Sequence, residues 1–209
     1  MSLGKKFRHW KLNKSRTEAF SDGVFAIVIT LLILEIKIPH IENGESSREL
    51  WEAMKELAPK IISWVVSFFF VAVMWVQHHN LFRIADKIDY AVVWLNIILL
   101  FFICFIPFPV ALMGEYPHNR LAVLFFGIVV TCAAYTQVGM YAHMSKYYLL
   151  PKYDYKSVRK NVRRSFFLAP MLLNIAIAVS FVNLMLCYVI YAMVPLFFLL
   201  PFDKEENTD

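Results

Sequence analysis

The sequence predicts an all-α membrane protein that crosses the bilayer six times. Of its 209 residues, 59% are hydrophobic and only 18% are charged, whereas a soluble domain is about half apolar and a quarter charged. The apolar residues also come in runs of about 20, the length of helix that crosses the hydrocarbon core of a bilayer. We therefore expect a polytopic integral membrane protein and exclude a single water-soluble core.

Six runs are long enough to be placed as transmembrane helices. The first covers residues 17–38 and is closed by Pro39. The last two divide one apolar stretch of about 35 residues, which is too long for a single span, so we place a tight helical hairpin near Asn183. All six belong to one domain, residues 1–209, and the spans after the first cover residues 60–80, 90–113, 119–141, 166–181 and 183–200.

Positive charge marks the side of the membrane on which the termini lie. Lys and Arg gather in the N-terminal segment, in the turn after the second span and in the loop after the fourth, and they are sparse in the opposite loops. The positive-inside rule then places both termini in the cytoplasm, in agreement with an even number of spans. The basic run 152–164 is interpreted as a topology signal that also meets anionic membrane lipid, so we expect no nucleic-acid partner. The compact size indicates a prokaryotic plasma membrane.

The loop between the first two spans contains a short amphipathic pattern. Ser46 or Ser47 can cap a helix at its N-terminus. This helix carries an apolar stripe and an acidic stripe. The apolar stripe comprises Leu50, Met54 and Leu57, and the acidic stripe comprises Glu45, Glu49, Glu52 and Glu56. The acidic stripe either raises the cation concentration at an outer mouth or is a solvated face.

The first span carries the residues on which a function can be argued. Asp22 and Glu35 are functional candidates, because an ionisable side chain in hydrocarbon is costly unless it is paired or hydrated. At about 100° per residue, another stripe of this helix comprises Gly23, Ile27, Leu31, Leu34 and Ile38, with Thr30 at its edge. Asp22 points about 140° away from Ile27. Such an aliphatic stripe normally faces lipid or a packing partner, so periodicity alone does not identify a pore.

Two motifs resemble those of a known family. The first span reads Arg16-x-x-x-Phe20-Ser21-Asp22, followed by Ala26-Ile27, Thr30-Leu31-Leu32 and Leu34-Glu35, with Pro39 closing the helix. This pattern is similar to the signature of the transmembrane protein 175 family of potassium channels. The end of the second span, Trp75-x-x-His78-His79, resembles a second patch of that family, and the six-span plan agrees over the whole chain.

The resemblance implies a homotetrameric channel in which four copies of the first span line a central pore. A second Phe-Ser-Asp is missing from the half that begins at Asn119, so a closed ring requires four chains. The positions that match the pore-constricting residues of the family are Ile27, Leu31 and Leu34, and Thr30 adds a possible layer of hydroxyl groups. Gly23 and Ile38 lie on the same stripe.

The resemblance also implies a structural polar network between helices, which is formed by Arg16, Ser21, Asp22, His78 and His79. Because Asp22 points away from the pore stripe, we expect it to pair with a group on a neighbouring helix, with His78 or His79 within reach. Adjacent histidines point about 100° apart and lack a third ligand at helical spacing, so we expect no metal site here.

The chemistry of the first span is consistent with a potassium pore. The chain contains no Thr-Val-Gly-Tyr-Gly segment, so a filter of backbone carbonyls is excluded and a hydrophobic constriction that gates by dewetting remains. Potassium sheds its hydration water more easily than sodium, so a modest preference for potassium follows. We expect potassium ions as the permeant species and no cofactor.

Two other function classes remain to be weighed. A proton-coupled transporter would use Asp22, Glu35 and the pair His78 and His79 as a relay. A membrane enzyme is disfavoured, because no nucleophile with its base, zinc motif, phosphate loop or carboxylate dyad stands out.

Overall fold

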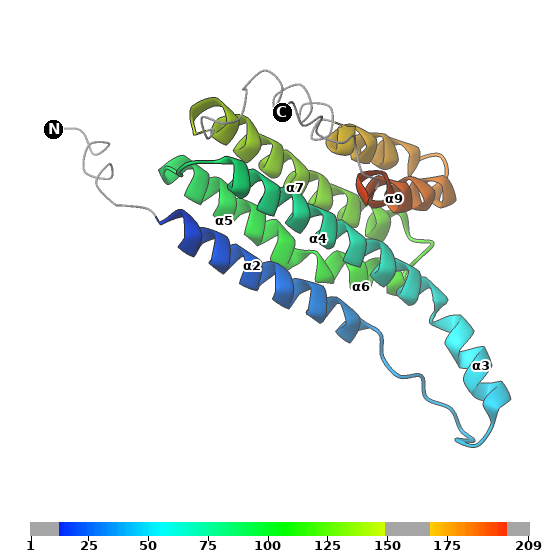
Figure 1. Ribbon diagram of the computed structural model, residues 1–209. Coiled ribbons are helices and arrows are strands. Elements are labelled where there is room, and N and C mark those ends of the chain that lie inside the picture. Colours follow the sequence, from blue (N-terminus) through cyan, green and yellow to red (C-terminus); the bar gives the residue numbers. More distant parts are fainter. Residues whose placement is uncertain (1–12, 149–167, 200–209) are drawn as a thin grey trace, which may run out of the picture.

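The computed structural model describes residues 13–148 and 168–199, and all the regular elements in these two ranges are helices. This confirms the all-α prediction. The helices run roughly side by side in an elongated bundle (Figure 1). In chain order they are α2 (Lys14–Leu31), the 3₁₀ helix η2 (Leu32–Glu35), α3 (Ser47–Glu56), α4 (Ala58–Ile84), α5 (Tyr90–Phe105), α6 (Pro107–Glu115), α7 (Arg120–Tyr147), the helix Leu168–Val179, and α9 (Leu184–Leu199).

The first predicted span corresponds to α2 and η2, but it ends earlier than expected. Asn13 caps its start by accepting hydrogen bonds from the N–H groups of Ser15 and Arg16. The helix tightens into a 3₁₀ turn and stops at Glu35, and Ile36 is already extended. The prediction that Ile38 continues the helical stripe is therefore wrong. A proline disfavours the helical conformation in the residue before it, here Ile38, and a 3₁₀ turn is a common helix ending.

The short helix predicted in the following loop is confirmed as α3. Its N-cap is Ser46, whose hydroxyl accepts a hydrogen bond from the N–H of Glu49. Its residues are exposed or half-buried, and in Figure 1 it extends beyond the end of the bundle. The helix is therefore attached to the bundle chiefly through its continuation into α4.

The third predicted span is divided into α5 and α6 at Pro107. Proline lacks the N–H that would bond one turn back, but it is favourable in the first turn of a new helix. Ile106 joins the two segments, and together Tyr90–Glu115 form one apolar unit long enough to cross a membrane.

Four helical units in the described ranges are long and apolar enough to span a bilayer: Lys14–Glu35, Ala58–Ile84, Tyr90–Glu115 and Arg120–Tyr147. The helices Leu168–Val179 and Leu184–Phe198 are apolar but shorter. The turn predicted between them is confirmed, because Asn183 caps the second of these helices by accepting a hydrogen bond from the N–H of Leu186.

Helix α2 lies at one edge of the bundle, against α4 and α5 (Figure 1). In its apolar window only 22% of the residues are buried, compared with 56% in α7. The last two helices lie on the other side of α4. The first span is therefore the least covered of the four long helices.

Candidate functional site on the first helix

One face of the first span, formed by α2 and η2, is fixed to the bundle by apolar packing. Phe25, Val28 and Leu32 are buried and belong to the core. They recur at intervals of three and four residues, the spacing that places side chains on one side of a helix. This face determines how the helix is rotated about its axis.

The opposite face is left uncovered by the rest of the chain. Ile27 and Leu34 are 59% and 58% exposed, and Leu31 is 43% exposed. At Gly23, an added Cβ would meet no atom of another element within 4 Å. The stripe predicted from periodicity is therefore exposed from Gly23 to Leu34, without Ile38.

Thr30 is exposed beside this stripe, and its hydroxyl is bonded to its own helix. Its Oγ1 lies 2.8 Å from the carbonyl oxygen of Ile27 and 3.1 Å from that of Ala26. The hydroxyl proton is used in these bonds, so the oxygen lone pairs are left to accept. Oxygen lone pairs of this kind can bind a bare or partly hydrated cation.

A buried polar group joins α2 to two other helices. Asn96 of α5 donates from Nδ2 to the hydroxyl of Ser21 at 2.9 Å, and its Oδ1 lies 2.8 Å from Nε2 of His78 on α4. Ser21 in turn donates to the carbonyl oxygen of Thr17. With the Asn96 oxygen facing its ring, His78 donates this bond in the tautomer that carries a proton on Nε2. All three members of this triad, Ser21, Asn96 and His78, are buried.

His78 fills its site through ring contacts as well. Its ring stacks on Phe82 with centroids 4.5 Å apart and lies 5.6 Å from Phe25. Its Nδ1 is buried without a hydrogen-bond partner among the described residues. A charged imidazolium would need a partner for both nitrogens, so this environment favours the neutral ring.

A second set of contacts joins α2 to α4 near the surface. Trp75 donates from Nε1 to a carboxylate oxygen of Asp22 at 2.9 Å. His79 Nδ1 lies 3.4 Å from a carboxylate oxygen of Glu18. Asp22 therefore has a partner on the neighbouring helix, as expected, but the partner is an indole and neither histidine bonds it.

Arg16 is not part of this arrangement. It is exposed, and its guanidinium makes no hydrogen bond or ion pair within the two described ranges. The sequence interpretation also missed Asn96, Trp75 as a hydrogen-bond donor, and Glu18. Asn96 carried a signal, because an amide in the middle of an apolar run usually bonds across helices.

The N-terminal end of α2 is tied to the turn between α4 and α5. Lys14 donates from Nζ to the carbonyl oxygen of Ala85 at 2.7 Å. In the same turn Asp89 caps α5 and lies 2.9 Å from His143 Nε2 and 2.8 Å from the hydroxyl of Tyr148. Lys14 and Asp89 thus connect the start of α2 to the end of α7 through one turn.

Asp89 is held in its charged form. Burial alone would raise the pKa of its carboxyl group, but hydrogen bonds from the backbone N–H of Val92 and from His143 and Tyr148 outweigh this effect, and the pKa is lowered. Burial and the bond to Asp89 raise the pKa of Tyr148. The cluster is therefore a carboxylate that accepts hydrogen bonds from three donors.

Comparisons with known proteins show which family the chain is similar to. The family described as "Endosomal/lysosomal potassium channel TMEM175" matches residues 16–107, which contain α2 and the helices that hold it. A potassium channel of Streptomyces collinus is 31% identical over 90% of this chain and 92% of its own. A proton channel, TMEM175 of Gallus gallus, is 38% identical over 57% of this chain and 26% of its own length.

A solved structure is also similar. The crystal structure of a lysosomal potassium-selective channel TMEM175 homolog from Chamaesiphon minutus has a TM-score of 0.79 and 31% identity, and the match covers 89% of this chain and 96% of that one. The family consists of ion channels, so the chain is not an enzyme. The chain belongs to the TMEM175 family of membrane channels.

Proposed function

We propose that four copies of this chain surround a pore lined by the exposed stripe of α2, and that the pore conducts potassium in preference to sodium. The observation that carries this proposal is the contrast between the two faces of one helix. The face with Ser21 and Phe25 is locked to α4 and α5, whereas the face with Ile27 and Leu31 is uncovered. The names of the relatives support the choice of ion.

A ring of four subunits accounts for this uncovered face. Identical chains that meet head to tail close into a ring under fourfold cyclic symmetry. Ile27 and Leu31 then project toward the axis from four sides, and Gly23 marks a wider level because it has no side chain. In this assembly the tetramer spans the plasma membrane with six helices per chain and with both termini in the cytoplasm.

The constriction selects ions by the cost of dehydration. An aliphatic ring offers no oxygen to replace water, so an ion crosses it only where the hydration shell is partly removed or the ring wets. Potassium holds its water less tightly than sodium, which gives a modest preference. Four Thr30 oxygens between the levels of Ile27 and Leu34 supply acceptors that reduce this cost.

Leu31→Ala tests the assignment, with Ile33→Ala as a matched control. Both side chains are 43% exposed, but Ile33 lies about 120–160° around the helix from Leu31, because η2 turns by about 120° per residue and α2 by about 100°. We expect Leu31→Ala to widen the constriction and to lower the potassium to sodium permeability ratio, measured as reversal potentials in planar bilayers. Ile33→Ala should leave the ratio unchanged. Equal ratios in both variants and the parent protein would contradict the assignment.

Proton permeation is a second candidate, because the Gallus gallus relative is named a proton channel. Flux into liposomes with a pH-sensitive dye distinguishes it from potassium flux. A proton-coupled transporter receives less support. Its relay would need Asp22 and His78 in contact, yet Asp22 bonds Trp75 and His78 bonds Asn96.

A further inference from the structure

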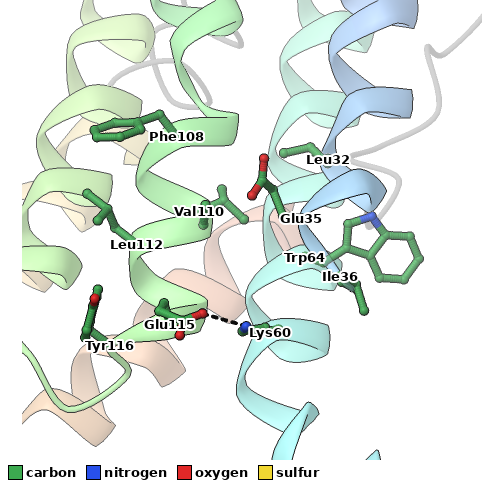
Figure 2. A pocket seen from close by; sticks show the side chains of 12 residues that line it. Leu32, Glu35, Ile36, Lys60, Trp64, Phe108, Val110, Leu112, Glu115 and Tyr116 are labelled. Atoms are coloured by element: carbon green, nitrogen blue, oxygen red, sulfur yellow. Dashed lines mark ion pairs between the residues drawn. The ribbon is translucent and has the colours of Figure 1, made fainter. Parts of the chain in front are cut away.

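A cavity of about 230 Å³ lies where η2, the start of α4 and α6 meet, at the end of the bundle next to the first loop. Figure 2 shows its lining. Most of the walls are apolar. Three of the lining side chains are aromatic, namely Trp64, Phe108 and Tyr116, and three are ionisable, namely Glu35, Lys60 and Glu115.

The charges around this cavity do not balance. Lys60 Nζ and a carboxylate oxygen of Glu115 are 2.5 Å apart, so these two charges compensate each other (Figure 2). Glu35 has no ion pair or hydrogen bond with any residue in the described part of the chain. The side chain of Glu35 is exposed and lines this largely apolar cavity, so one negative charge is left without a counter-charge among the described residues.

The same cavity has two further features that suit an organic ligand. Aromatic rings attract cations through their negatively charged faces and also cover apolar groups. Trp64 Nε1 is buried and has no hydrogen-bond partner among the described residues, so one donor remains for an acceptor on a ligand. Inorganic cations take several oxygen ligands, and apart from its carboxylates this lining offers few.

We propose that this cavity binds a small organic ammonium ion, with Glu35 as its counter-ion and Trp64, Phe108 and Tyr116 around its apolar part. The same ammonium group occurs in soluble amines and in the headgroups of lipids. Leu32, Glu35 and Ile36 form one wall, so an occupant contacts the last turn of the helix that bears the exposed stripe. Binding can be measured without ion flow, which separates this proposal from the proposed channel function.

Choline and its uncharged isostere 3,3-dimethylbutanol are matched probes for this cavity. We expect titration calorimetry of the full-length protein in detergent to show choline binding, with the alcohol at least about tenfold weaker. Glu35→Gln should weaken the affinity for choline by about tenfold, because it removes the charge and keeps the size of the side chain. Glu56→Gln removes an exposed carboxylate on α3 and should leave choline binding unchanged.

Phe108→Leu provides a second variant, since it removes a ring but keeps an apolar side chain. This substitution should weaken the binding of choline more than it weakens the binding of the alcohol. Equal affinity for the two probes, or an equal loss in the Glu35 and Glu56 variants, would overturn the proposal. Nanodiscs of phosphatidylglycerol with and without phosphatidylethanolamine identify the source: competition by the ethanolamine lipid assigns a headgroup, and its absence assigns a soluble amine.

Discussion

The amide of Asn96 connects three helices, so its removal is expected to loosen α2. Asn96→Ala leaves His78 Nε2 and one contact of Ser21 without a partner. Buried polar groups without partners cost about 1–3 kcal/mol each, and we expect a loss of that order in the free energy of unfolding, measured by thermal or SDS titration in detergent. Asn174→Ala, at an exposed asparagine, is the control and should cost less.

A double-mutant cycle sharpens this prediction. Ser21→Ala and Asn96→Ala should couple by about 0.5 kcal/mol or more, because they share one hydrogen bond of 2.9 Å. Additive effects would show that the triad does not act as a unit.

Individual contacts were less predictable from the sequence than the faces on which they lie. The direction of Asp22, away from Ile27, follows from helix geometry alone. Its bond to Trp75 does not, because the choice among Trp75, His78 and His79 depends on how α4 is rotated. That rotation is set by tertiary packing, in which the His78 ring contacts Phe25 and Phe82. A single sequence does not show this packing.

At the scale of helices, two glycines differ in their surroundings: Gly127 is packed within the subunit, and Gly23 is on an uncovered face. A Cβ at Gly127 of α7 would collide with the hydroxyl of Tyr191 and lie 3.0 Å from Ile177, whereas Gly23 has open space. Gly127→Ala should therefore lower the thermal unfolding midpoint. Gly23→Ala should not lower it, since alanine favours a helix by about 1 kcal/mol.

Gly23→Ala has a second expected effect if α2 surrounds a pore. Four added methyl groups at one level narrow the passage, so single-channel conductance should fall while the protein stays folded. Unchanged conductance would place Gly23 away from the permeation path.

The turn between α4 and α5 makes stability depend on pH. The pKa of Asp89 is lower in the folded protein than in the unfolded chain, so its contribution is complete above about pH 3.9 and is lost as the pH falls through the lowered value. Asp89→Asn keeps a capping side chain and removes the charge. We expect it to lower the unfolding midpoint at pH 7, with a difference from the parent protein that shrinks toward pH 3. A constant difference would show that the effect does not come from the charge of Asp89.

Two helix starts were predicted correctly from the sequence, and one helix end was predicted wrongly. The turn at Asn183 and the cap at Ser46 were correctly predicted, and at both positions the side chain accepts a hydrogen bond from the next turn. The end of the first span was misplaced by three residues, since η2 ends at Glu35 whereas apolar Ile36 and Ile38 continue the hydrophobic pattern after the backbone has left the helix. Hydropathy records which residues are apolar, but the hydrogen bonds of the backbone decide where a helix stops.

For the whole molecule, the decisive question is whether the uncovered face of α2 meets its own copies. In a cysteine-free background, with Cys104, Cys132 and Cys187 replaced by Ala, Ile27→Cys should form disulfide-linked dimers on oxidation. Neighbouring helices at a narrow fourfold constriction bring such side chains within disulfide range, with Cα atoms about 4.4–6.8 Å apart. Leu121→Cys, at a position 73% exposed on α7, is the control and should stay monomeric on a denaturing gel. Dimers from Leu121→Cys but not from Ile27→Cys would indicate that the exposed face of α2 faces lipid, and would contradict a pore lined by this helix.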